Sequence, residues 1–129
     1  MRVAIATQEL ARVDAHFGWA RHLMFYEVSA EGYRHLRTAS FGSGLLPDGD
    51  HGKLAPRLKE VEGCSLVFVV DVGPDGEHGL ARQNIAPMRQ FAGQPIAAAL
   101  DALRDSLRAN PSRWLRQQEQ RVRRTQADD

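Results

Sequence analysis

The sequence predicts an α/β domain built on a mixed sheet, and three observations support this. Short apolar runs typical of strands recur along the chain. Amphipathic helix patterns separate the later runs. Two strand patterns joined by a short turn, typical of a β-hairpin, lie near the N-terminus. Strands that alternate with helices build layered domains, and 129 residues suffice for one such domain.

The expected strands begin with residues 2–7, a short and mostly apolar run. Residues 23–28 and 32–41 flank a Ser-Ala-Glu-Gly turn and predict an antiparallel hairpin. Residues 65–70, Ser-Leu-Val-Phe-Val-Val, are almost continuously apolar, which is typical of a central strand buried on both faces. Residues 85–91 are the last expected strand, joined to the previous one through a helix.

Three helices complete the expected fold. A short helix follows a glycine-rich loop at 71–79 and extends to Asn84. The last helix begins at Pro95, which suits a first helical position, and stops at Asn110 before a proline. The first helix covers residues 51–62, with Asp50 as its N-cap. Its apolar face consists of Leu54, Leu58 and Val61, and its charged positions are Lys53, Arg57, Lys59 and Glu60.

The composition excludes several classes of protein. No apolar run approaches the roughly 18 residues that span a bilayer, and the N-terminus shows no signal-peptide pattern, so we expect a cytoplasmic protein. A net charge of +1 does not indicate a nucleic-acid partner. The single cysteine, Cys64, excludes an internal disulfide, a multi-thiolate zinc site and a cluster held by four cysteines of one chain.

We expect one domain over residues 1–111 and a separate polar tail over residues 112–129. Five arginines and one glutamate lie between Arg113 and Arg124. Trp114, Leu115 and Val122 stand among them, so the tail reads either as a solvated helix or as a segment that docks an acidic partner.

The stretch 13–20, Val-Asp-Ala-His-Phe-Gly-Trp-Ala, is the most informative loop and is called the His16 loop below. Gly18 is expected to let its backbone turn, and Phe17 to anchor it. Neutral imidazole is the commonest metal ligand in proteins, and Asp14 is placed to orient the ring of His16. A histidine that merely caps the loop is the other interpretation.

Other candidate residues lie in or beside the remaining loops. His51 and His78 open or precede helices, where the dipole favours anions. Cys64 is either a small core residue or a thiolate ligand. His22 and His35 fall on the hairpin and are expected to be structural. Because loops at 8–18 and 71–79 both follow expected strands, a site at the carboxyl ends of these strands is predicted.

Motifs of known catalytic chemistry are missing from the sequence. Asp48-Gly-Asp50 lacks the spacing of a calcium loop, and residues 73–76 are not followed by the Lys-Ser/Thr of a phosphate-binding loop. No HExxH, CxxC or GxSxG occurs. A small hydrolase with Asp14 and His16 as an acid–base pair remains a minor alternative, and we expect no enzyme and no catalytic residues.

Four segments, in order and at suitable spacing, resemble the dinitrogenase iron–molybdenum cofactor biosynthesis family. They are Val3–Thr7, Val13–Ala20, Asp50–Ala55 and Glu62–Val67, and the closing residues Asn110–Leu115 resemble the NifX-type members in particular. The resemblance covers most of residues 1–116. It implies a ribonuclease-H-like domain with about five strands in a mixed sheet, flanked by helices.

The resemblance also implies a function. Such accessory proteins of nitrogen fixation bind the iron–sulfur precursor of the nitrogenase cofactor and carry it between the precursor-synthesising protein and the scaffold. In the family the histidine of the His-Phe-Gly motif is the favoured ligand, which is His16 here. Asp14, His51, His78 and Cys64 are its candidate partners in cofactor binding, and His78 stands where related chains often have small residues.

A preassembled cluster brings its own sulfides, so a carrier needs few protein bonds, and few bonds permit release. Arg12, Arg21 and Arg82 are candidates for offsetting the charge of the cluster. We expect a monomer or weak homodimer. The alternative is a metal-free module that docks nitrogenase or its scaffold.

Overall fold

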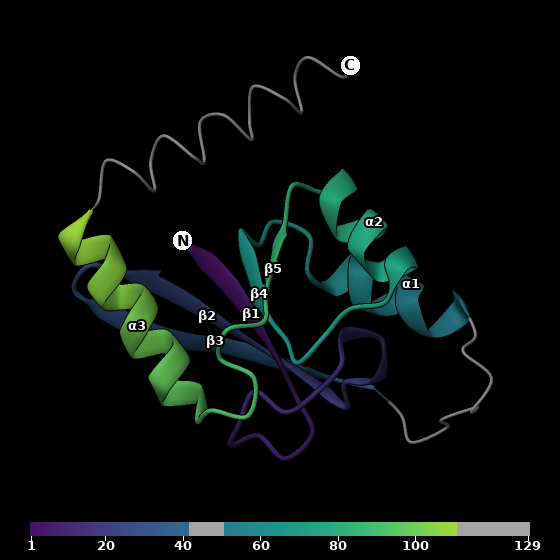
Figure 1. Ribbon diagram of the computed structural model, residues 1–129, viewed down its shortest axis with the longest axis horizontal. Helices are drawn as coiled ribbons and strands as arrows, with labels where there is room; N and C mark the ends of the chain where they lie inside the picture. The colour runs from purple at the N-terminus through teal and green to yellow at the C-terminus, as the bar shows by residue number, and fades with distance from the viewer. Residues whose placement is uncertain (42–50, 111–129) are drawn as a thin grey trace.

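The computed structural model describes residues 1–41 and 51–110. Five strands, three α-helices and one turn of 3₁₀ helix lie in these ranges (Figure 1). The strands are β1 (Arg2–Thr7), β2 (His22–Ser29), β3 (Gly32–Ser40), β4 (Leu66–Phe68) and β5 (Ala86–Met88). The helices are η1 (Phe17–Trp19), α1 (His51–Glu60), α2 (Pro74–Arg82) and α3 (Ile96–Ala109).

The strands form one mixed sheet in the order β3-β2-β1-β4-β5. β1 and β2 are antiparallel, as are β2 and β3, whereas β1, β4 and β5 run parallel. The predicted mixed five-stranded α/β fold is therefore confirmed, with the hairpin on one side of β1 and the parallel strands on the other. The tail after residue 111 and the N-cap Asp50 lie outside the described residues.

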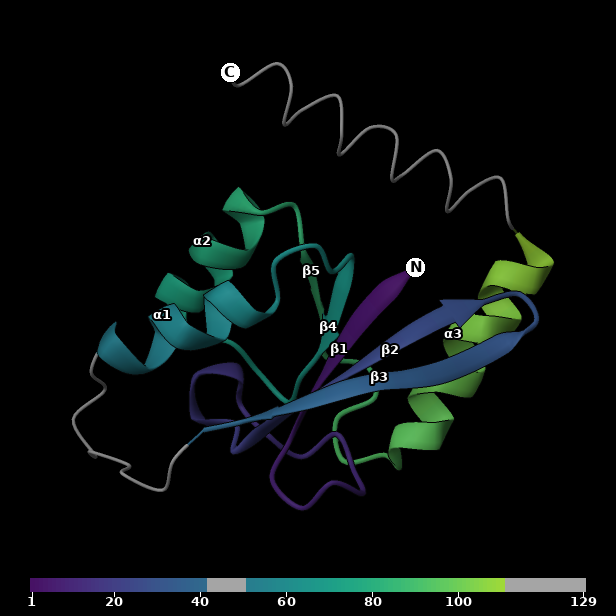
Figure 2. The ribbon, with the colours of Figure 1, turned by 180° about the vertical axis from the view of Figure 1, so that it is seen from behind.

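The helices cover the two faces of this sheet (Figures 1 and 2): α1 and α2 lie on one face and α3 on the other. Alternation along β1 supplies both cores, because Ala4 and Ala6 point toward α1 and α2 while Val3 and Ile5 point toward α3. All three residues of β4 are buried, as a central strand requires. Burying each large side chain stabilises the fold by about 1.5–3 kcal/mol.

The α2 helix corrects one prediction, because it begins at Pro74, inside the expected loop 71–79. Proline suits the first turn of a helix, and the glycines that favoured a loop serve packing instead. A Cβ at Gly79 would lie 2.6 Å from a methyl of Leu58 on α1, and one at Gly76 would lie 2.8 Å from Val72. The glycines thus let α2 lie close against α1, and His78 is on a helix.

Arg57 corrects a second prediction. Its side chain, expected on the charged side of α1, is buried, with 3% of the residue exposed. Position 57 follows Leu54 by three residues and precedes Val61 by four, which places it on the apolar face. Its Nε and Nη2 atoms donate to the carbonyl oxygen of Ala20 at 3.2 and 2.7 Å, and its guanidinium lies 4.3 Å from the centre of the Phe41 ring.

The last two strands are shorter than expected. The apolar run 65–70 yields β4 over three residues, and Val70 is already 40% exposed. β5 also has three residues, one of which is proline. Ala86 N donates to Ser65 and the carbonyl of Met88 accepts from Val69, so Ala86 and Met88 face β4. Pro87 therefore has its nitrogen on the outer edge, where it removes a donor.

Candidate functional site

The candidate site lies where the chain changes direction across the sheet. From β1 the chain passes to β2 on one side, and it returns at β4 on the other. In open α/β sheets, ligands bind beyond the carboxyl ends of the strands at such a switch point. The two loops meet there: Val70 N donates to Ala15 O at 2.9 Å, and Phe17 N donates to Asp71 O at 3.0 Å. The predicted position of the site is occupied by the His16 loop.

His16 caps the 3₁₀ turn that follows it. Its Nδ1 atom accepts a hydrogen bond from Gly18 N at 3.1 Å, and its carbonyl accepts from Trp19 N at 3.0 Å. Phe17 is fully buried and anchors the loop as expected. Because Nδ1 accepts, the neutral ring carries its proton on Nε2. The free protein thus offers an N–H donor at the outer edge of the ring.

Two glycines lie beside the ring of His16, and the residue is partly exposed. A Cβ at Gly18 would lie 3.7 Å from Nδ1, and a Cβ at Gly73 would lie 4.0 Å from Nε2. Gly18 lies in the 3₁₀ turn, as expected of this residue, and its backbone is not left-handed. A Cβ at either glycine would be in ordinary van der Waals contact with the imidazole. Gly73 is the N-cap of α2. Because the ring of His16 lies beside Gly73, it lies beside the start of this helix.

Asp14 does not orient the ring, which corrects another prediction. Its Oδ1 atom accepts from Thr7 Oγ1 at 3.1 Å and from Gln8 N at 2.7 Å. The carboxylate thereby closes the turn at the end of β1, and the acid–base pair of the hydrolase alternative is not formed. Gln8 is a contact that sequence reasoning missed: its side chain donates to Trp19 O at 3.0 Å and accepts from Arg21 N at 2.9 Å. Gln8 fastens the far end of the His16 loop to β1.

A charged cluster borders the site and was also missed. Arg89 follows β5 and donates to Asp71 Oδ1 at 2.9 Å and to Glu77 Oε1 at 3.3 Å. The hydrogen bond from Arg89 lowers the pKa of Asp71, helped by a bond from Val72 N and by the nearby ring of His16. The sequence could have indicated this cluster, because Asp71 and Arg89 are the first charged residues after the parallel strands β4 and β5.

Two of the three arginines expected near the cargo lie elsewhere or are engaged. Arg12 donates to Gly93 O at 3.0 Å, and Arg82 is in the last turn of α2, away from its N-terminus. Arg21 is exposed just beyond the His16 loop.

Cys64 does not join His16. It precedes β4, at the amino end of a strand whose carboxyl end carries the site, because β1 and β4 are parallel. The residue is buried, and burial raises the pKa of its thiol to about 11. This thiol is a core residue, as the first of its two interpretations stated.

The histidines beyond His16 are dispersed. His51 opens α1, and His78 is exposed in the middle of α2. His22 Nδ1 pairs with Ser40 Oγ at 2.8 Å and His35 Nε2 with Thr38 Oγ1 at 2.9 Å, in keeping with structural roles on the hairpin. Among the side chains described, in residues 1–41 and 54–110, no three from histidine, cysteine or acidic residues are grouped so as to hold a metal ion.

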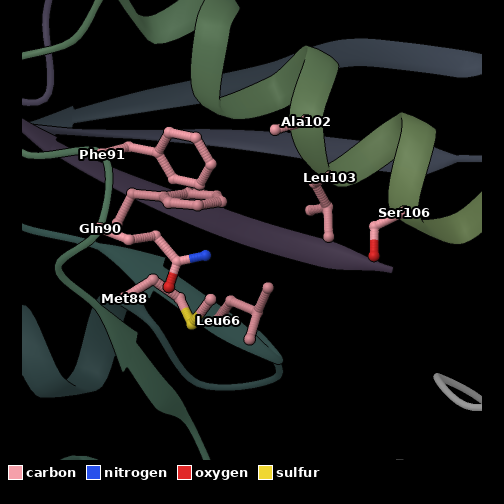
Figure 3. Close-up of a pocket in the computed structure, with 8 residues that line it drawn as sticks. Leu66, Met88, Gln90, Phe91, Ala102, Leu103 and Ser106 are labelled. Atoms are coloured by element: carbon pink, nitrogen blue, oxygen red, sulfur yellow. The ribbon is translucent and has the colours of Figure 1, made fainter.

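A separate hollow lies on the opposite face of the sheet, between α3 and the strands β4 and β5 (Figure 3). Its volume is about 100 Å³, and its walls are mostly apolar. The lining residues are Leu66, Phe68, Met88, Gln90, Phe91, Ala102, Leu103 and Ser106. None of these side chains is a strong metal ligand, so the hollow is not a second candidate for the cluster.

Comparison with known proteins assigns the chain to a family. A family model described as dinitrogenase iron-molybdenum cofactor matches residues 1–106. The chain belongs to the dinitrogenase iron-molybdenum cofactor family. NifX of Herbaspirillum seropedicae is 40% identical over 116 residues, covering 90% of this chain and 80% of that protein. NifX of Azotobacter vinelandii is 33% identical and covers 95% of this chain and 77% of its own length.

Two further similarities widen this picture. The FeMo cofactor biosynthesis protein NifB of Bradyrhizobium diazoefficiens is 31% identical over 73% of this chain, but only 19% of that protein is matched. A domain of this family is thus a small part of a larger biosynthetic protein. The crystal structure of PH0822 has a TM-score of 0.61 at 22% identity, covering 82% of this chain and 90% of that one, and supports the fold. Membership of the family places this chain in iron–molybdenum cofactor biosynthesis.

No helix in the described part of the chain is long and apolar enough to cross a membrane.

Proposed function

We propose that this chain is a non-enzymatic carrier that binds the iron–sulfur precursor of the iron–molybdenum cofactor and passes it between assembly proteins in the cytoplasm. The observation that carries the proposal is the presentation of His16. Its ring lies beside Gly18 and Gly73 at the switch point of the sheet, and its Nδ1 atom accepts a hydrogen bond from a backbone amide. The residue is partly exposed, which gives a large cargo access to it.

The hydrogen bond at Nδ1 lowers the affinity that we expect this site to have for iron. A histidine that binds metal through Nε2 usually donates its Nδ1 proton to a neighbour. Here Gly18 N donates to Nδ1, so the neutral ring carries its proton on Nε2. Ligation of iron through Nε2 requires this proton to leave Nε2. If the proton moves to Nδ1, the hydrogen bond from Gly18 N is lost. Losing a neutral hydrogen bond costs about 0.5–1.5 kcal/mol, up to about tenfold in affinity. A carrier that must release its cargo benefits from such a bond.

The site offers one imidazole and few other ligands. Asp14 and Cys64 are engaged in the turn and the core, and His78 lies on the exposed surface of α2. This scarcity fits a cargo that arrives with its own sulfides, and it excludes a simple mononuclear site built from the described residues. The partners we propose are the precursor-synthesising protein and the scaffold, since a domain similar to this chain occurs within NifB.

Anaerobic loading tests this proposal. The purified chain is mixed with precursor cluster, passed over a desalting column, and analysed for iron and for the visible absorption of the cluster. We expect bound iron in the wild type, a large loss in His16→Ala, and little change in the matched variant His78→Ala. Equal iron in the wild type and His16→Ala would reject His16 as the ligand.

The metal-free docking module is the competing function. It is favoured by the engaged Nδ1 atom of His16 and by the absence of a ligand group among the described residues. A wild-type chain that binds assembly proteins but retains no iron after desalting would establish it in place of the carrier.

A further inference from the structure

A buried arginine holds the far end of the His16 loop. Arg57, on the apolar face of α1, is 3% exposed, and among the described side chains it is the only charged one that is buried to this degree. Removing a guanidinium from water costs free energy, and an apolar side chain would suit the same position of the helix without that cost. Packing alone therefore does not account for an arginine here, and its hydrogen bonds are the feature to explain.

Two donors of the guanidinium converge on a single carbonyl. Nε and Nη2 of Arg57 donate to the oxygen of Ala20 at 3.2 and 2.7 Å. Ala20 is fully buried, so its carbonyl depends on protein donors rather than on water. Two bonds from a rigid, planar fork fix the position of an oxygen more closely than one flexible donor does. Arg57 therefore ties α1 to the residue that ends the 3₁₀ turn.

Ala20 and His16 are the two ends of that turn. His16 is the N-cap of η1, and Ala20 is its C-cap. Trp19 N donates to His16 O at 3.0 Å, and Ala20 N donates to Phe17 O at 3.5 Å. A single turn of 3₁₀ helix has too few bonds to keep its shape alone. The position of the His16 ring, whose Nδ1 accepts from Gly18 N within the turn, thus depends on how firmly both ends are held.

Gln8 holds the same end of the turn from β1. Its side chain donates to Trp19 O at 3.0 Å and accepts from Arg21 N at 2.9 Å, and these two groups lie on either side of Ala20. The carbonyl of Ala20 itself is bonded from α1, by Arg57. With the arginine removed, the link between this end of the turn and α1 is lost.

Phe41 fixes the guanidinium in turn. The centre of its ring lies 4.3 Å from the guanidinium of Arg57, close enough for a cation–π interaction. The amide of Phe41 donates to Arg21 O at 2.8 Å. Arg57 therefore lies between two segments that are bonded to each other, the end of β3 and the end of the His16 loop.

We propose that Arg57 is a positioning residue for His16, an inference that rests on the proposed carrier function. By holding the carbonyl of Ala20, the guanidinium keeps the backbone of the turn in the shape that places the imidazole beside Gly18 and Gly73. A ring on an ordered backbone binds cargo more tightly than a ring on a mobile one, because less conformational freedom is lost on binding. An arginine that only filled the core would affect global stability and leave the ring in place.

Two effects of losing Arg57 oppose each other. A looser turn weakens the bond from Gly18 N that competes with ligation, which favours cargo binding. The freed backbone must, however, be ordered again when cargo binds. Fixing one backbone residue costs at least as much free energy as one hydrogen bond contributes, and the turn contains several residues. The ordering cost dominates, so a variant without Arg57 should bind cargo more weakly.

Three variants test the proposal. Arg57→Met keeps the length and the apolar packing of the side chain and removes its donors. Arg57→Lys keeps the positive charge and one donor group. Leu103→Ala lies in the core on the opposite face of the sheet, so it lowers stability without touching the loop and is the matched control for stability.

The first measurement is amide exchange in the metal-free chain. The amide of Gly18 should exchange about tenfold faster in Arg57→Met than in the wild type, the factor expected for one lost hydrogen bond. The amides of β1 should change no more than they do in Leu103→Ala, and Arg57→Lys should restore part of the protection at Gly18. Wild-type exchange at Gly18 in Arg57→Met, or equally fast exchange there in Leu103→Ala, would overturn the proposal.

The second measurement is anaerobic loading with the iron–sulfur precursor at a temperature at which all variants are folded. We expect Arg57→Met to need about tenfold more cluster for half-loading, yet to reach the wild-type iron content at saturation. Leu103→Ala should load as the wild type does, and an equal weakening in this control would show that Arg57 acts through stability alone.

Two further outcomes are covered by the same design. If the wild type takes up no cluster, the carrier function fails, and exchange at Gly18 still decides whether Arg57 holds the turn. If Arg57→Met does not fold, Arg57→Lys replaces it in both measurements, with an expected effect of about threefold because one donor remains. Wild-type behaviour of Arg57→Lys in both measurements would then reject the proposal.

Discussion

Replacing His16 separates its capping bond from the cargo binding that we propose for it. His16→Ala removes both the Nδ1 acceptor that caps the 3₁₀ turn and the Nε2 edge that we propose as the ligand. His16→Asn keeps a side-chain acceptor at nearly the position of Nδ1 and removes only the outer edge of the ring, because asparagine has the reach and preference of an N-cap. The alanine variant should therefore lose stability and cargo, and the asparagine variant only cargo.

The expected size of the stability effect follows from the single bond at stake. One neutral capping bond of 3.1 Å between Gly18 N and Nδ1 contributes about 1 kcal/mol. For a domain of this size, such a loss lowers the melting temperature by about 3–5 °C. We expect that decrease in His16→Ala and a decrease of less than about 1 °C in His16→Asn.

Thermal unfolding followed by circular dichroism measures the first effect, and iron retained after anaerobic desalting measures the second. The reasoning is refuted if His16→Asn is as unstable as His16→Ala, because the Gly18 bond would then not stabilise the loop. It is equally refuted if His16→Asn retains a full load of iron, because the Nε2 edge would then not contact the cargo.

Three further predictions concern the frame around the site. Burial raises the pKa of Cys64 from 9.0 to about 11, so its thiolate fraction at pH 8 is about a hundredfold lower than in the unfolded chain. Iodoacetamide should therefore label Cys64 only in urea. Ready labelling of the folded protein would contradict its burial. Arg57→Met leaves the carbonyl of Ala20 without its two donors. It should lower the free energy of unfolding, measured in urea, by about 1–3 kcal/mol and speed amide exchange in the His16 loop. An unchanged midpoint would show that the arginine is dispensable. Gly79→Ala places a methyl 2.6 Å from Leu58 and should lower stability by about 1 kcal/mol despite the better helix propensity of alanine, whereas a Leu58→Ala background should remove the penalty.

Periodicity predicted most of the fold because the elements that it found are set by local pattern. The strand at 2–7, the hairpin around Gly32 and the helix after Pro95 all appear, since each has an apolar repeat and a clear start or stop. The predicted start of α2 was wrong because Gly76 and Gly79 look like loop residues, whereas close packing against Val72 and against Leu58 of α1 explains them. Long-range packing of this kind leaves no mark in a single window of sequence.

The position of the candidate site was predictable, but its internal contacts were not. The sequence placed the loops 8–18 and 71–79 after expected strands, and the parallel pairing of β1 with β4 brings these loops together. The partner of the His16 ring was assigned to Asp14 because a carboxylate two residues away is chemically plausible, yet that carboxylate bonds Thr7 and Gln8. Which acceptor a donor chooses depends on loop geometry to within a few tenths of an ångström, and residue order does not specify it.

The proline in β5 also affects how readily copies of this chain associate through their sheets. Pro87 deprives the outer edge of the sheet of a hydrogen-bond donor. Arg89, two residues further on, belongs to the charged cluster that borders His16, so a strand added along β5 would extend toward the site. By discouraging sheet extension at this border, Pro87 disfavours fibrils and swapped dimers that would cover this edge of the sheet.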